Sequence, residues 1–222
     1  MKMDANIIID NVKRKVLQLF NFNILSSKTF YRCKHLAEFF GITLDQGSPA
    51  MADSFVYWIK PKQPYVKLNT DGFVGLLTAG ARGIIRDFGG EVVAAFATPL
   101  QINDVISAEL NALILGLELC IKYSCNYVWI ELDAMFIVQS IKDETTGNAN
   151  YFYLFRKVKN IMNEMNVFIS HIYREGNVCA DWLANRGSTL YGYEELNILN
   201  LDQVLKGMIL MDKACMPYLR AG

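Results

Sequence analysis

The sequence lacks a surplus of charge of either sign: among its 222 residues, 22 Lys and Arg balance 22 Asp and Glu. A protein that coats nucleic acid by bulk electrostatics needs a basic excess. The composition therefore argues against that class, but it leaves room for a site that contacts a few phosphates locally. Hydrophobic residues make up 52 % of the chain, enough for one ordinary domain with a buried core and an appendage.

The sequence also lacks cysteine pairs and long apolar runs. Its five cysteines are odd in number and form no Cys-x-x-Cys motif, so neither a zinc ribbon nor a disulfide framework is indicated, and reduced thiols are expected. Asp4 and Asp10 interrupt the N-terminal segment, which predicts no signal peptide, and no stretch reaches the roughly 18 apolar residues of a membrane span. We therefore expect an intracellular protein, nuclear or cytoplasmic, with no membrane partner.

Apolar periodicity and proline divide the chain into segments. Residues 5–25 and 28–41 have apolar side chains at helical spacing, whereas Pro61 and Pro64 exclude a helix interior around them. No internal repeat or low-complexity tract is evident. We expect three segments: a helical N-terminal arm and linker (1–55), a main domain (56–190) and a partly helical C-terminal tail (191–222).

The main domain alternates between β and α patterns. Asp87-Phe88-Gly89-Gly90 is typical of a hairpin turn, because glycine accepts positive φ. Three strands joined by short turns predict an antiparallel meander, and later strand–helix–strand units predict two parallel additions, with helices on the faces of the sheet. The expected elements, in the order βββαβααβα, are strands 66–71, 79–86, 91–98, 126–132 and 167–173 and helices 104–123, 136–141, 151–165 and 177–188. The predicted fold class is thus α/β with a five-stranded mixed sheet.

Four acidic residues lie at element ends or in first helical turns, each within apolar sequence. Asp71 ends the first strand, Asp133 follows the fourth, and Glu109 and Asp181 fall in first turns of helices. Carboxylates are rarely buried unless they are paired or bind metal, and a cluster of them suits Mg²⁺, with Mn²⁺ as the alternative ion. Two such ions roughly 4 Å apart can activate a water and stabilise the leaving oxygen of a phosphodiester. The four acids together therefore predict a two-metal nuclease site.

Each acid taken singly also has a structural explanation. Asp71 suits a turn before a glycine, and Asp133 suits a cap of the following helix. Glu109 and Asp181 can complement a helix dipole. The prediction of a metal site therefore depends on all four occurring in order on these elements.

Five motifs resemble the ribonuclease H-like domains of plants, and in particular the C-terminal ribonuclease H portion of non-LTR retroelement reverse transcriptases. The motifs are Asn69-Thr70-Asp71-Gly72, Gly83-Ile84-Ile85-Arg86-Asp87-Phe88-Gly89-Gly90, Ala108-Glu109-Leu110-Asn111-Ala112-Leu113, Glu131-Leu132-Asp133-Ala134, and Arg174-Glu175-Gly176-Asn177 continuing to Ala180-Asp181-Trp182-Leu183-Ala184. The resemblance covers residues 56–190. It implies a ribonuclease H-like fold and an endonuclease that hydrolyses the RNA strand of RNA–DNA hybrids with two Mg²⁺. By position it makes Asp71, Glu109, Asp133 and Asp181 the catalytic metal ligands.

Two departures from that family bear on activity. Bacterial-type members carry a loop histidine before the last acid, whereas His171 falls within the fifth strand; we retain it as an auxiliary residue and weigh a structural role as the alternative. Some members bind the hybrid through a basic handle, but the connection 142–149 is short and not basic. This predicts that the affinity for the hybrid is either weak or supplied by another module.

Further residues are placed to contact nucleic acid. Asn103 and Asn111 are predicted readers of the 2′-hydroxyl, although Asn103 also suits a loop or cap position. Arg82, Arg86 and Arg174 are predicted phosphate contacts, with solvated surface charge as the alternative.

Three hypotheses remain open. The first is a ribonuclease acting on hybrids as a monomer. The second is a catalytically inactive, retroelement-derived domain that binds nucleic acid or a protein. The third, a different nuclease or strand-transfer enzyme on the same fold, fits the spacing of the acids less well.

Overall fold

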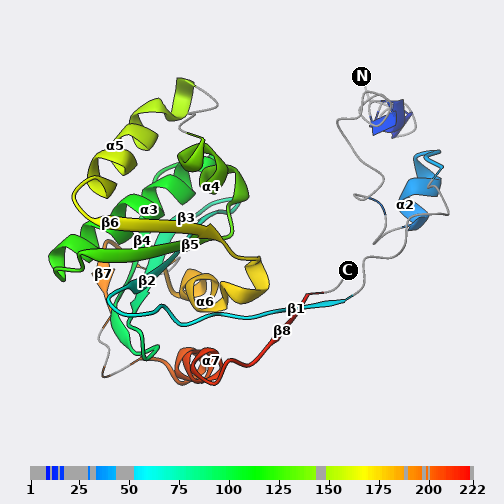
Figure 1. Ribbon diagram of the computed structural model, residues 1–222. Helices are drawn as coiled ribbons and strands as arrows, with labels where there is room; N and C mark the ends of the chain where they lie inside the picture. The colour runs from blue at the N-terminus through cyan, green and yellow to red at the C-terminus, as the bar shows by residue number, and fades with distance from the viewer. Residues whose placement is uncertain are drawn as a thin grey trace. The chain divides into compact units, whose positions relative to one another are not determined.

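The computed structural model describes most of the chain (Figure 1). The described residues are 9–10, 12–14, 16–17, 30, 34–43, 53–143, 149–187, 190–196, 199 and 201–220. The chain divides into two compact units, 1–52 and 53–221. The predicted connection 142–149 lies largely outside the described residues. No helix among the described residues is long and apolar enough to cross a membrane.

The first unit contains the helix α2 (Lys34–Phe39), which lies within the predicted helix 28–41. Buried Phe30, Ala37 and Ile42 pack together there. Described residues between 9 and 17 are helical, as the spacing predicts, and the remainder of the predicted helix 5–25 lies outside the described residues.

The second unit is built on a six-stranded sheet with the order β6-β5-β2-β3-β4-β7 (Figure 1). Strands β2, β3 and β4 are antiparallel, whereas β5 lies parallel to β2 and β6 parallel to β5. This confirms the predicted mixed sheet, to which the short β7 adds a sixth strand antiparallel to β4. The strands of this sheet are β2 (Val66–Val74), β3 (Ala79–Arg86), β4 (Val92–Leu100), β5 (Tyr127–Leu132), β6 (Asn166–His171) and β7 (Glu194–Glu195).

Helices cover both faces of the sheet. One apolar cluster joins the strands to α3, α4 and α5, and a second joins them to α6 and α7 on the opposite face (Figure 1). A separate two-stranded sheet pairs β1 with β8. The bounds are α3 (Val105–Lys122), α4 (Met135–Lys142), α5 (Phe152–Met162), α6 (Val178–Gly187), α7 (Gln203–Lys213), the 3₁₀ turns η2 (Ala149–Tyr151) and η3 (Arg174–Gly176), β1 (Ser54–Val56) and β8 (Tyr218–Arg220).

Local chemistry explains two boundaries near the sheet. The turn between β3 and β4 has Gly90 at φ +82°, and the Asp87 carboxylate accepts the backbone N–H groups of Gly89 and Glu91 at 2.8 Å each. Helix α3 begins after Asp104, whose carboxylate accepts the N–H groups of Ile106 and Ser107. The turn confirms the predicted hairpin, and the cap fixes where the helix that carries Glu109 begins.

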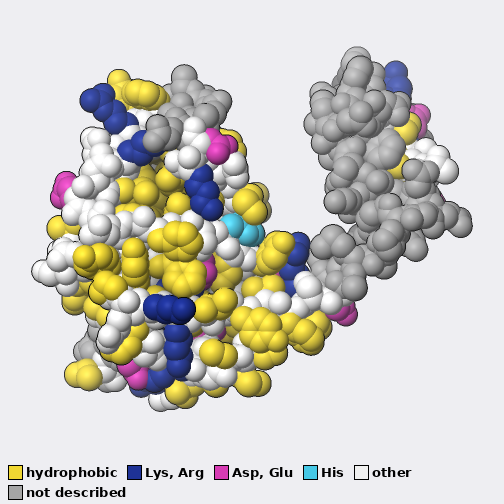
Figure 2. All heavy atoms as spheres, in the orientation of Figure 1, with side chains coloured by type: hydrophobic (Ala, Val, Ile, Leu, Met, Phe, Trp, Pro, Cys, Tyr) yellow, Lys and Arg dark blue, Asp and Glu magenta, His cyan; other side chains and the backbone are white. Residues whose placement is uncertain are grey.

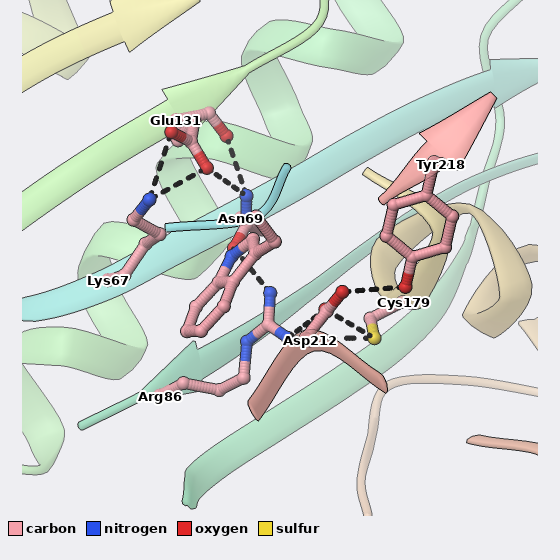
Figure 3. A network of polar contacts seen from close by, with 8 residues as sticks. Lys67, Asn69, Arg86, Glu131, Cys179, Asp212 and Tyr218 are labelled. Carbon is pink, nitrogen blue, oxygen red and sulfur yellow. Dashed lines mark hydrogen bonds and ion pairs between the residues drawn. The ribbon is translucent and has the colours of Figure 1, made fainter. Parts of the chain in front are cut away.

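A buried polar network ties the C-terminal helix α7 to the sheet (Figure 3). Arg86 of β3 forms an ion pair with Asp212 of α7 and donates a second hydrogen bond to Asn69 at 2.9 Å. Its guanidinium also lies 3.6 Å from the ring centroid of Trp58. The Tyr218 hydroxyl donates to the other Asp212 oxygen at 2.6 Å. The network therefore joins α7 and β8 to the centre of the sheet.

These contacts correct one prediction. The Arg86 side chain is 1 % exposed, so no phosphate can reach it from solvent. The sequence analysis predicted a phosphate contact at Arg86, with a solvated surface charge as the alternative, and both require an exposed side chain. Its partner Asp212 lies 126 residues later in the chain. No local sequence pattern predicts an ion pair between residues so far apart.

Candidate active site

Three of the four predicted acids meet at one end of the central strands. Asp71 belongs to β2, Glu109 to α3, and Asp133 directly follows β5. Each offers a carboxylate oxygen, and these oxygens all lie within 4.8 Å of one another. Asp71 and Glu109 are buried, whereas Asp133 is half-buried. The parallel pairing of β2 with β5 brings two of these acids together. Asn69 lies opposite Glu131, and Asp71 and Asp133 each follow two residues later on the same side.

Glycine at position 72 lets the helix carrying Glu109 approach the strand. A Cβ built on Gly72 would lie 2.2 Å from the backbone carbon of Ala108. The Gly72 N–H donates to Glu109 Oε2 at 3.1 Å. The sequence analysis expected the strand to end before Gly72, but β2 continues to Val74. The glycine therefore provides a close approach between backbones and not the predicted turn.

Gly72→Ala is accordingly expected to disrupt the cluster. The added methyl group has no room beside Ala108, so α3 must shift away from β2 and carry Glu109 with it. Overpacking of this kind costs on the order of 1–3 kcal/mol. Chemical denaturation measures the loss. Gly192→Ala is the matched control, because a Cβ there meets nothing within 4 Å; equal stability of the two variants would contradict the prediction.

The shared charge of the cluster perturbs two of its acids. Burial, and then the charges of Asp71 and Asp133, raise the pKa of Glu109 to about 9. Burial, and then Asp71, raise the pKa of Asp133 to about 6. Carboxylates held this close favour protonation, or a cation among them. The donor set of hard oxygens therefore fits a divalent metal ion of the Mg²⁺ or Mn²⁺ type.

Asn177 completes the polar lining, and the sequence analysis assigned it no role of its own. Its Nδ2 donates to Thr70 O at 3.1 Å and to Asp133 Oδ1 at 3.3 Å. Its Oδ1 is buried without a hydrogen-bond partner among the described residues. The only signal in the sequence was its place within the motif that begins at Arg174.

Asp181 lies outside the group of three. Its Oδ1 accepts a hydrogen bond from Arg174 Nη2 at 2.9 Å, and its side chain is 40 % exposed. Arg174, a predicted phosphate contact, is itself 74 % exposed. The fourth predicted ligand is thus held at the rim of the cluster by an arginine of the preceding 3₁₀ turn.

The remaining predicted contacts lie on different elements. Asn103 is exposed just before α3, and Asn111 is half-buried, donating to Ser107 O at 2.7 Å. His171 is half-buried at the end of β6, opposite Leu132. Burial lowers its pKa, whereas a hydrogen bond with the backbone of Asp133 opposes that shift. His171 is therefore tied to the loop of Asp133 without joining the three converging carboxylates.

Comparison with known proteins decides the family. Residues 69–187, more than half of the chain, match the family described as "Reverse transcriptase-like". The chain belongs to the reverse transcriptase-like family. All four acids and Asn177 lie within the matched residues.

A plant protein supports the assignment of a ribonuclease H-like domain. A protein of Arabidopsis thaliana that carries the provisional name of a ribonuclease H protein is 30 % identical over 143 residues, covering 62 % of this chain. The chain spans only 23 % of the length of that relative. The predicted resemblance of this chain's main domain to plant ribonuclease H-like domains is thus confirmed.

Solved structures support the fold. RNase H1 of the archaeon Halobacterium salinarum has a TM-score of 0.53 at 20 % identity, covering 55 % of this chain and 96 % of its own. LC11-RNase H1, solved in complex with an RNA/DNA hybrid, has a TM-score of 0.52 at 24 % identity, covering 55 % and 96 %. The predicted ribonuclease H-like α/β fold is therefore confirmed.

Proposed function

We propose that this family member is a divalent-metal-dependent endonuclease that hydrolyses the RNA strand of RNA–DNA hybrids. The observation that carries the proposal is the convergence of Asp71, Glu109 and Asp133 within 4.8 Å. The names of its relatives support the same activity, since one is named a ribonuclease H protein and another was solved with a hybrid.

The proposed ligands are Asp71, Glu109 and Asp133, with Asp181 as the fourth. Two bound Mg²⁺ or Mn²⁺ ions would supply an activated water and charge stabilisation at the leaving oxygen. Asn177 orients Asp133 through the 3.3 Å hydrogen bond, and its buried Oδ1 accepts no hydrogen bond from the part of the chain that the structure describes. Asp181 is exposed enough to turn from Arg174 toward the cluster. The protein's own contribution is thus to hold several carboxylates together in a partly dry site.

Recognition of the hybrid is proposed to be weak. On the face of the second unit that Figure 2 shows, Lys and Arg side chains of the described residues are scattered among apolar ones. Asn103, Asn111 and Arg174 remain the proposed contacts, with RNA distinguished through its 2′-hydroxyl. A hybrid-cleavage assay across Mg²⁺ and Mn²⁺ tests the function directly, and an intact hybrid under all these conditions would refute it.

One observation favours a second candidate, a catalytically inactive domain that binds nucleic acid. Two of the four acids already pair with arginines, Asp71 with Arg82 and Asp181 with Arg174. Each pairing neutralises a proposed ligand. This candidate predicts that the protein binds labelled hybrid without cleaving it. A gel-shift measurement of binding, made beside the cleavage assay, distinguishes this candidate from the nuclease.

Ion affinity should rise with pH. The ion-free site holds a proton on Glu109, whose pKa is about 9, and on part of Asp133, whose pKa is about 6. A carboxylate must lose its proton to bind metal, so a higher pH removes the competitor. We expect Mn²⁺ affinity to increase by up to about tenfold per pH unit between roughly pH 6 and 9.

Isothermal titration calorimetry in buffers of different ionisation enthalpy measures both the affinity and the protons released. Release of about one proton near pH 7 is expected. Glu109→Gln, which carries no titratable proton, should weaken binding and flatten this dependence. An affinity that does not change with pH in the unmodified protein would contradict the prediction.

A further inference from the structure

A buried arginine lies inside the acidic cluster. Arg82 of β3 is the direct cross-strand partner of Asp71 on β2, so both side chains lie on the same face of the sheet. Arg82 Nε donates to Asp71 Oδ2 at 2.8 Å, and Nη2 donates to the same oxygen. The arginine side chain is only 3 % exposed. The sequence analysis predicted that Arg82 contacts phosphate, but the side chain is too buried for a phosphate in solvent to reach it.

Packing holds the guanidinium in this place. Its central carbon lies 4.6 Å from the ring centroid of Phe73, two residues after Asp71 on the same strand. Alternate residues of a strand share a face, so Asp71 and Phe73 flank the arginine together. The pair is therefore built into the β2–β3 hairpin.

The charge of Arg82 acts on the whole cluster. Burial lowers the pKa of Arg82, and Asp71, Asp181 and Glu109 oppose that shift. Burial raises the pKa of Glu109, and Arg82 in turn opposes part of that rise. The guanidinium thus supplies part of the positive charge that a metal ion would otherwise supply to the same carboxylates.

Asn177, which contacts another acid of the cluster, keeps one acceptor atom without a partner among the described residues. Asn177 is 2 % exposed and donates to Asp133 through Nδ2, while its Oδ1 has no hydrogen-bond partner among the described residues. Within the cluster, Asp71 therefore has a buried cationic partner, whereas Asn177 beside Asp133 has an acceptor that no described residue satisfies.

We propose that Arg82 is an internal counter-cation that competes with divalent ions for Asp71. Two cations a few ångströms apart in a poorly solvated site repel strongly. An ion bound to Asp71 must therefore displace the guanidinium from Oδ2 or share the carboxylate with it at reduced affinity. This inference rests on the proposed function for the ion site, but it does not require turnover.

Arg82→Met tests the competition. Methionine removes the charge and keeps an apolar chain beside Phe73. Calorimetry on the full chain should show Mn²⁺ binding tighter by about tenfold or more than in the unmodified protein. The ion-free variant should melt at a lower temperature, because Asp71 loses its buried partner, and Mn²⁺ should raise that midpoint by more than it does in the unmodified protein.

Lys157→Gln is the matched control. This variant also loses one positive charge, but the partner of Lys157, Glu118, lies on the surface, nine positions beyond Glu109 in α3. The Lys157→Gln variant should bind Mn²⁺ with the same affinity as the unmodified protein. A purely structural role for Arg82 would lower the melting temperature of Arg82→Met without tightening ion binding.

Unchanged or weaker Mn²⁺ binding by folded Arg82→Met would overturn the proposal, as would the absence of ion binding by either protein. If Arg82→Met does not fold without ions, the unmodified protein decides the question. Its Arg82 Nε–H signal in ¹⁵N NMR should move on addition of saturating Mg²⁺, and an unmoved signal would overturn the proposal. Tighter binding without hybrid cleavage would support the role of Arg82 while refuting the proposed function.

Discussion

Asp71→Asn is expected to reduce hydrolysis of an RNA–DNA hybrid by more than about 100-fold. Loss of a mere supporting partner of a metal ligand typically costs about 10–100-fold, and Asp71 is proposed as a ligand itself. It also contributes to the raised pKa values of both Glu109 and Asp133, so its charge is central to the cluster. A labelled hybrid incubated in Mg²⁺ and resolved by electrophoresis measures the rate.

Glu118→Gln is the control for this measurement. Glu118 lies on the same helix as Glu109, carries the same charge, and pairs with Lys157 at the surface. Glu118→Gln should cleave the hybrid at the same rate as the unmodified protein. Asp71→Asn retaining more than a tenth of that rate would refute the role of Asp71, and an inactive unmodified protein would favour the non-catalytic candidate.

Asp212→Asn is expected to destabilise the second unit by about 3–5 kcal/mol. Removal of one partner from a buried ion pair leaves the other charge uncompensated. Both Arg86 and Asp212 have side chains that are 1 % exposed, so no solvent is available to replace the lost partner (Figure 3). Urea denaturation followed by circular dichroism measures the change in unfolding free energy.

The same helix supplies the control for this prediction. Lys213 of α7 pairs with Glu91 at the surface, where such pairs contribute about 1 kcal/mol or less. Glu91→Gln should therefore change stability little. The double variant Arg86→Met with Asp212→Leu should recover most of the loss, because neither charge of this pair then remains. A loss below 1 kcal/mol in Asp212→Asn would show that the network does not support the fold.

The order of elements was predictable because local periodicity carries it. The strand 79–86 and the helix over Glu109 were predicted nearly to the residue, because the glycine turn after the strand and the apolar spacing of the helix are local signals. The turn at Gly90 was predictable for the same reason. The extent of β2 was not, because Gly72 serves a backbone approach to α3 that only the packed structure contains.

The sequence by itself determined the family resemblance, the mixed sheet and the acids that lie near its edge, because motif spacing and apolar periodicity are properties of the chain. Tertiary structure alone decided how those acids are partnered. Asp71 meets Arg82 through strand register, Asp181 turns to Arg174, and Arg86 is buried against Asp212. The physical reason is that a charged side chain looks the same in sequence whether solvent or a distant opposite charge satisfies it. The four carboxylates can thus be recognised from the sequence, whereas the pairing of Asp71 and Asp181 with arginines exists only in the folded protein.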